Sequence, residues 1–315
     1  MPFILANAQQ LSQNKLTNYV IDEFRKSALM DKLTWDNNAK SQGGSSFNYV
    51  YNRVTTLPTA APRLINADYN AQEPLTTAVT ATLGILGGSF QIDRALAANE
   101  KEVVDLVQFA VQQKAQATIA QYAHEFINGS AILGTGEFDG LDVFFAGGGA
   151  GQVIATGVDL DSGTDITSNW RTLLDQMRQA RALMDKAPNI WLMNQDMYAV
   201  WQSVMDRAGI NVLSKAEYGY EVAQWGPALV MPLGDRPGTS NPIIATANGL
   251  TRIYGLYLGL DGVHGIAPDN GAFVKTYLPD FTNSAALQTG AVEMIAGVAI
   301  KSIRSAVRID NIDIV

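Results

Sequence analysis

The sequence predicts an α+β fold whose parts differ strongly in shape, and three observations carry this prediction. Two strand-like runs flank a proline-rich stretch within residues 41–92, a helical pattern covers residues 99–128, and strands alternate with helices between residues 165 and 275. The chain has 315 residues, of which 47% are hydrophobic and 17% are charged. It can therefore bury a sizeable core and is long enough for about two domains.

Residues 1–40 are predicted to form an N-terminal arm. Leu16, Val20 and Phe24 recur at the spacing of one helical face, while the charged residues of the segment lie mainly off that face. Two interpretations of this amphipathic helix stay open. It packs on its own domain, or it docks on a neighbouring subunit.

Residues 41–92 are predicted to form an extended β-hairpin loop. Phe47, Tyr49 and Tyr51 alternate along the first strand, and a second strand-rich run extends from Thr77 to Ile92. Prolines interrupt the region between them, at Pro58, Pro62 and Pro74. Because its tip has few large apolar residues, the hairpin cannot form a core alone, and we expect it to project or to lie on another surface.

A long helix is predicted over residues 99–128. Asn99 and Glu102 have the spacing of a capping box, and Gly129 directly after Asn128 supplies a left-handed stop. At 1.5 Å per residue, this helix would be roughly 43 Å long.

The long helix is assigned to a peripheral domain formed by residues 93–164 and 276–315. The domain is discontinuous in sequence because strand-like alternation returns in the tail of the chain. There, one face of a strand is expected to be lined by Ile303, Ser305, Val307 and Ile309. We expect this tail to pair back onto the domain that holds the long helix.

Residues 165–275 are predicted to form an axial α/β domain. A first helix precedes a buried strand at Ile190–Met193, after which Asn194 caps a second helix that stops at Gly209. Further strands are expected at 228–231, 242–247 and 251–258.

Residue types that carry catalytic or metal chemistry are sparse. The chain has no cysteine, which excludes disulfides and thiolate metal sites, and its two histidines, His124 and His264, do not have metal-ligand spacing. Neither a GxSxG elbow nor a phosphate-binding P-loop motif is present. Asp159, Asp161 and Asp165 faintly suggest a calcium loop, but the EF-hand order is not met, and ordinary turn chemistry explains them better. No cofactor and no enzymatic activity are therefore predicted.

The charge balance is acidic. The net charge is −8, and no dense run of lysine and arginine occurs. Such a chain is better suited to enclosing DNA than to binding it tightly, so no sequence-specific DNA binding is expected. Neither a signal peptide nor a membrane-spanning segment is predicted.

Four stretches, taken in order, carry a resemblance to a known family. They are the arm LTNYVIDEFRKS at 16–27, YVYNRVTT at 49–56, FING with FDGLD at 126–129 and 138–142, and WGPALV at 225–230. In this order they resemble the major capsid proteins of tailed phages that have the Hong Kong 97 fold. That fold has an N-terminal arm, an extended loop, a spine helix, a discontinuous peripheral domain and an axial domain.

The resemblance implies a structural function. Copies of the chain would close into hexamers and pentamers of an icosahedral phage head that encloses double-stranded DNA. The implied location is the virion, after assembly in the host cytoplasm, with no membrane. Scaffolding, decoration and portal proteins are the implied partners besides the chain itself. An encapsulin, which is a bacterial protein cage of the same fold, is the alternative, and a soluble α/β enzyme is the alternative of another class.

Seven residues are candidates for subunit interfaces: Leu16, Val20, Phe24, Tyr49, Tyr51, Arg53 and Arg63. The two arginines are candidates for charge pairing between subunits. The sequence departs from the family's best-known member in having no long segment before the arm and no lysine between Ser41 and Glu100. Some members cross-link through a lysine of the extended loop, and arginine cannot replace it as a nucleophile. A shell without covalent links is therefore expected.

Overall fold

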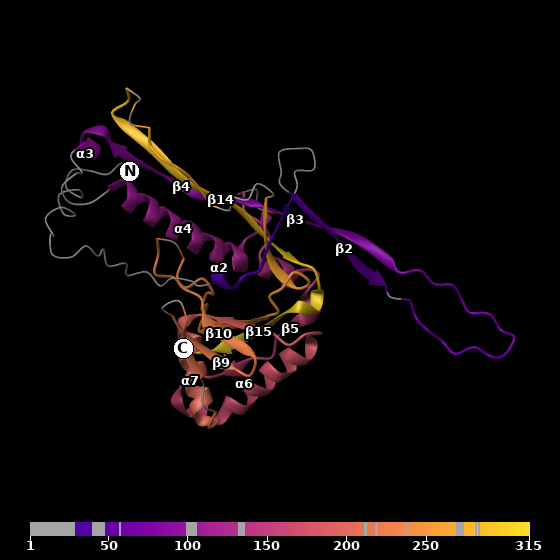
Figure 1. The fold of residues 1–315 in the computed structure, drawn as a ribbon. Coiled ribbons are helices and arrows are strands. Elements are labelled where there is room, and N and C mark those ends of the chain that lie inside the picture. Colours follow the sequence, from indigo (N-terminus) through magenta and orange to yellow (C-terminus); the bar gives the residue numbers. More distant parts are fainter. Residues whose placement is uncertain are drawn as a thin grey trace.

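The fold was obtained as a computed structural model, which describes residues 29–39, 48–56, 58–98, 106–131, 136–210, 213–217, 220–236, 238–268, 274–280, 282 and 284–315. Two packed units and a projecting hairpin make up this part of the chain (Figure 1). The predicted arm helix with Leu16, Val20 and Phe24, and the predicted capping pair Asn99 and Glu102, lie outside the described residues.

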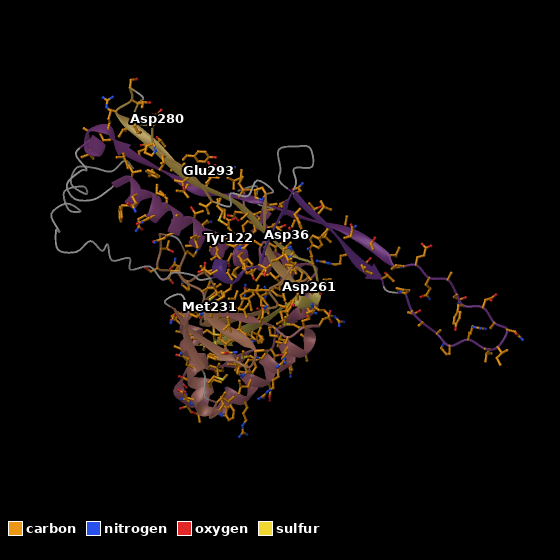
Figure 2. All side chains as sticks on the ribbon, in the orientation of Figure 1. Asp36, Tyr122, Met231, Asp261, Asp280 and Glu293 are labelled. Carbon is orange, nitrogen blue, oxygen red and sulfur yellow. The ribbon has the colours of Figure 1, made fainter. Side chains whose placement is uncertain are left out.

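The peripheral unit places a helix, α4 (Leu106–Asn128), along one face of a five-stranded sheet. Four strands follow the order β1 (Trp35–Ala39), β12 (Val263–Pro268), β14 (Leu287–Ile300) and β13 (Val274–Tyr277), and β4 (Gly84–Asp93) also pairs with β14. Two short helices, α2 (Leu29–Lys32) and α3 (Arg94–Ala98), flank this sheet. Figure 2 shows Tyr122 in the middle of the unit, where its side chain is completely buried.

The long helix is confirmed over its described part. It has 23 residues, equivalent to about 34 Å, and ends at Asn128 as predicted. Alternate residues of β4 face it, because Leu86, Phe90 and Ile92 are buried while their neighbours are not.

The extended hairpin consists of β2 (Asn48–Thr56) and β3 (Leu75–Thr82), which pair antiparallel. The predicted second strand, from Thr77 to Ile92, is divided at Leu83, which corrects the expected end of the loop at residue 92. Its second half is β4, which leaves the hairpin and pairs with β14 over ten residues. The division follows the side chains, since β4 offers large apolar residues to α4 and β3 is mostly Thr and Ala.

The axial unit is built on an eight-stranded sheet. Its order is β5 (Val153–Ile154), β15 (Ala306–Asp313), β11 (Leu250–Leu256), β7 (Ile190–Met193), β10 (Ala228–Pro232), β9 (Tyr220–Trp225) and β8 (Leu213–Glu217), with β6 (Val158–Asp159) also paired to β15. Two helices, α6 (Gly163–Leu183) and α7 (Gln195–Arg207), pack on one face. The other face adds Leu192, Tyr254 and Leu256 to the core of the peripheral unit, so the two units share one continuous core.

The predicted limits of the second axial helix are confirmed. The side-chain oxygen of Asn194 accepts a hydrogen bond from the backbone N–H of Met197 at 2.8 Å, which is an N-cap contact. Gly209 has a φ of +66°, as the left-handed stop requires.

Two expectations for the sheets were wrong. Of the tail strands, β14 joins the peripheral sheet as expected, but β15 pairs with β11, β5 and β6 in the axial sheet. Residues 303–305, expected in that strand, form a short 3-10 turn before it.

The strand predicted at 242–247 does not form either. Ile243 and Ile244 are buried, but the segment makes only isolated bridges at Pro242 and Ala247. The chain reverses immediately afterwards through Asn248 and Gly249, which both have positive φ, and the Ala247–Leu250 bridge closes this turn. Within the described residues, no helix is long and apolar enough to span a membrane.

Candidate assembly surfaces

Tyr49, Tyr51 and Arg53 lie at the root of the hairpin and face the rest of their own chain. Their alternation along β2 puts them on one face, as the sequence predicted. The Tyr51 hydroxyl donates to the backbone carbonyl of Ile300 at 2.7 Å, and Arg53 Nε donates to the carbonyl of Lys301 at 3.1 Å.

A second nitrogen of the Arg53 guanidinium, Nη2, also donates to the Ile300 carbonyl, so Arg53 binds the C-terminal end of β14. These contacts fix the hairpin root to its own chain. A contact of the same residues with a neighbouring subunit stays a prediction.

A compact polar cluster supports the root beside these contacts. The Tyr49 hydroxyl donates to Asp36 Oδ2 at 2.8 Å, and Lys301 Nζ lies 5.6 Å from the centre of the Tyr49 ring. His264 is completely buried and meets the same ring edge-on at 6.0 Å. Burial lowers the pKa of His264, and the nearby Lys301 ammonium lowers it further. The histidine therefore packs in the interior against the Tyr49 ring.

The hairpin tip, residues 58–74, is stabilised by contacts among its own residues. Arg63 Nη1 donates to the carbonyl of Ala67 at 3.2 Å, and its guanidinium lies 5.5 Å from the centre of the Tyr69 ring. The side-chain oxygen of Gln72 accepts from both the backbone N–H and the hydroxyl of Thr59, at 2.7 and 2.8 Å. Arg63 thus has a local role within the tip, and its charge pairing with a neighbour stays a prediction.

The tip exposes large apolar side chains that have no cover within the described part of the chain. Leu64 is 82% exposed, Ile65 92% and Tyr69 66%. Several exposed large apolar side chains close together in sequence are typical of interaction surfaces.

Three large apolar side chains are exposed among polar ones on the peripheral sheet, on the face turned away from α4. We call it the outer sheet face and define it by Ile85 on β4, Tyr277 on β13 and Leu287 on β14. The strand registers place all three on the side opposite the buried Val292 and Met294. Their exposed fractions are 60%, 51% and 42%.

An ion-pair network links the two units. Asp142, in the short helix α5 (Leu141–Ala146), accepts hydrogen bonds from Arg252 Nη1 at 2.9 Å, from the Tyr254 hydroxyl at 2.7 Å and from Arg308 Nη1 at 3.0 Å. Arg308 also donates to Asp310 Oδ2 at 2.8 Å. Sequence reasoning missed this network, since Asp142 lies more than 100 residues away in sequence from each of its three donors and the donors follow no local pattern.

The carboxyl group of Glu125 is buried near the C-terminal end of α4. Glu125 accepts from the Gln121 amide at 2.9 Å and is almost completely covered. Burial raises its pKa to about 7; the Gln121 hydrogen bond opposes this rise, and the nearby Glu137 carboxylate adds to it. The backbone at Gly140 passes very close to the end of α4. A Cβ at this position would lie 2.4 Å from the Glu125 backbone carbonyl oxygen, so a larger residue would not fit.

Asp159, Asp161 and Asp165, which faintly suggested a calcium loop, do come together within 4.8 Å. They lie at the N-terminus of α6, where Ser162 caps the helix by accepting from the backbone N–H of Asp165. Acidic residues are favourable at a helix N-terminus because of the exposed N–H groups there. This local structure accounts for the cluster.

Comparisons with known proteins identify the fold. No protein-family model and no curated protein matches the sequence. Solved structures do match over nearly the whole chain.

The SrpI encapsulin complex from Synechococcus elongatus PCC 7942 has a TM-score of 0.64 at 16% identity, covering 99% of this chain and 97% of that chain. The capsid of Myoviridae phage XM1 has a TM-score of 0.60 at 10% identity, covering 98% and 99%. The capsid of an empty GTA particle has a TM-score of 0.60 at 15% identity, covering 98% of each chain. The chain therefore has the Hong Kong 97-type capsid fold, as its sequence resemblance predicted.

Proposed function

We propose that this chain is the major capsid protein of a tailed phage. Copies of it assemble into hexamers and pentamers of an icosahedral head that encloses double-stranded DNA without reading its sequence. The observation that carries the proposal is the hairpin, whose root is fixed to its own chain while its apolar tip extends away from both units (Figure 1). A projecting hairpin with Leu64, Ile65 and Tyr69 exposed at its tip suits a contact in which a partner covers these side chains.

The partner we propose is a second copy of the chain, which receives the hairpin tip on its outer sheet face. Each surface exposes large apolar side chains on the single chain, and pairing the two surfaces covers these side chains. Burying side chains such as Leu64 and Ile65 stabilises a contact by about 1.5–3 kcal/mol each. Repetition around a closed shell multiplies this gain.

The remaining partners follow from the same proposal. Scaffolding, decoration and portal proteins act with the shell, which assembles in the host cytoplasm and ends in the virion. The net charge of −8 supports a container that does not adhere tightly to its DNA. The role is structural rather than enzymatic.

An encapsulin-type cage is the second candidate function, and the match to the SrpI encapsulin complex favours keeping it. The two candidates differ in what the particle contains. Particles purified from cells and treated with nuclease would protect genome-length DNA if the chain is a phage capsid protein, and would hold protein cargo without DNA if it is an encapsulin.

The assembly test uses the full-length chain, expressed with and without its genomic neighbours and examined by electron microscopy. Closed shells are expected. The double substitution Leu64→Ser with Ile65→Ser should reduce shell yield while the subunit stays folded, because both side chains are exposed. Leu260→Ser is the matched control, since Leu260 is 50% exposed but lies in the turn between β11 and β12, away from the hairpin tip. Equal shell yields from the two variants would argue against the tip contact, and monomers in every condition would end the capsid proposal.

A further inference from the structure

The axial unit contains a pocket that the shell-forming surfaces do not use. It has a volume of about 270 Å³ and lies between the C-terminal half of α6 and the turn that joins β9 to β10. Two arginines, two tryptophans and two prolines form most of its lining: Arg178, Arg181, Trp191, Trp225, Pro188 and Pro227.

The walls of the pocket are flat, apolar and held in place. Trp191 is 1% exposed, and its six-membered ring lies against Gly255, where a Cβ would come within 2.6 Å of the ring. The ring centres of Trp191 and Trp225 are 6.1 Å apart at an angle of 55°. Gly226, with a φ of +62°, makes the turn that brings Trp225 and Pro227 to the pocket. Walls of this kind suit a flat apolar group.

The polar side-chain groups of the residues that line the pocket are all hydrogen-bond donors. Arg178 and Arg181 are one helical turn apart on α6, and Arg181 has no acidic partner among the described residues. Arg178 reaches Asp175 at 2.8 Å, but both side chains are more than 60% exposed, so water screens this pair strongly.

The indole N–H of Trp191, on the ring edge opposite Gly255, is buried and has no acceptor in the part of the chain that the structure describes. Buried donors normally have a partner. This N–H is not accessible from the pocket, so the donors that a ligand can reach are the guanidinium groups of Arg178 and Arg181, beside flat apolar walls.

We propose that this pocket binds a carboxylate carried on a flat apolar group. The guanidinium fork matches the planar geometry of a carboxylate, and the tryptophan and proline walls receive the apolar part of the ligand. The volume lies just under the 300–1,000 Å³ usual for small-molecule sites, which fits one side chain with its carboxylate and excludes a large cofactor. Two sources carry this chemistry: a free aryl acid, and the C-terminus of a protein that ends in an aromatic residue.

Isothermal titration calorimetry on the full-length protein tests the proposal, with 3-phenylpropionate as the probe. Saturable binding of one molecule per chain is expected, weakening as salt is raised. The uncharged 3-phenylpropanol should bind at least about tenfold more weakly, because it cannot make charge-assisted hydrogen bonds. Phenyl phosphate is the second comparison, and tighter binding of it than of the carboxylate would overturn the assigned ligand class.

Variants locate the binding. Arg181→Gln should reduce affinity by about tenfold or more. Arg171→Gln is the matched control, since Arg171 is on the same helix but lies over the ring of Trp170, at 5.0 Å, rather than in the pocket. Thermal unfolding of both variants checks that they are folded. Unchanged affinity in Arg181→Gln, equal losses in both variants, or no saturable binding of the wild type would overturn the proposal.

Peptides distinguish the two sources of the ligand. A tetrapeptide ending in phenylalanine with a free carboxylate should compete with the probe if the natural ligand is a protein terminus, and the same peptide with an amidated end should not. Competition by neither peptide, with the probe still bound, would assign the pocket to a free acid. Because Arg181 lies outside the proposed shell contacts, shell yield and ligand binding are read independently.

Discussion

Asp142→Asn is expected to lower the free energy of unfolding by about 2 kcal/mol, a loss worked out from the contacts of this carboxylate. Asp142 is the shared acceptor for Arg252 and Tyr254 on β11 and for Arg308 on β15. The substitution keeps the size and one oxygen of the side chain but removes its charge. It therefore tests the charge that ties α5 to the axial sheet and leaves the packing alone.

The three contacts contribute unequally. Arg308 and Asp142 are mostly covered, with side-chain exposures of 13% and 25%, and a hydrogen bond of this kind to a charged group is worth about 1.5–3 kcal/mol. Asparagine retains a neutral acceptor, so roughly half of that value is lost. Arg252 is 46% exposed and adds only about 0.5 kcal/mol, as does the weakened bond from Tyr254.

Asp185→Asn is the control, because Asp185 pairs with Arg304 at 3.2 Å while both side chains are at least 60% exposed. Its loss should be at most about 0.5 kcal/mol. Urea unfolding of the unassembled subunit measures both variants, and the midpoint should shift while the slope stays constant. Equal small losses in the two variants would refute the reasoning, since they would show that the Asp142 network is no stronger than an exposed ion pair.

Three further predictions concern pH, covalent structure and the arm. Because burial raises the pKa of Glu125 from 4.5 to about 7, the folded state holds a proton that the unfolded state releases, so the free energy of unfolding should fall as pH rises between these values. Glu125→Gln should flatten this slope, and an unchanged slope in unfolding measured from pH 4 to 8 would contradict it. Boiled particles should give a single band near 33.9 kDa on a denaturing gel, and a ladder of heavier species would disprove a shell without covalent links. Val20→Ser with Phe24→Ser should reduce particle yield if the arm clamps adjacent subunits, and unchanged yield and thermal stability would count against the clamp.

The sequence predicted those elements whose signals are local. Asn194 and Gly209 limit a helix through contacts within a few residues, so their chemistry can be recognised in any context. The proline-rich tip between two strand runs likewise indicated a hairpin. Alternation could not show where one strand changes partners, and this is why the division at Leu83 was missed.

The candidate interface residues were predictable only in part. Alternation correctly put Tyr49, Tyr51 and Arg53 on one face of β2. It could not indicate what that face meets, because the acceptors at Ile300 and Lys301 lie about 250 residues away in sequence. The placement of β15 in the axial sheet was missed for the same reason, since one strand pattern fits either sheet.

The continuity of β14 gives the hairpin a defined mechanical path into the rest of the molecule. Tension applied at the tip reaches β4 through the backbone of β3 and Leu83, and it reaches the carbonyls of Ile300 and Lys301 through Tyr51 and Arg53. These carbonyls lie at the C-terminal end of β14, a 14-residue strand whose first ten residues pair with β4. Hydrogen bonds of an antiparallel pair lie across the strands, so tension along β14 loads these pairs in shear, together rather than one after another. In the proposed shell, outward pressure would thus be resisted at each subunit by the whole ladder of hydrogen bonds between β14 and β4.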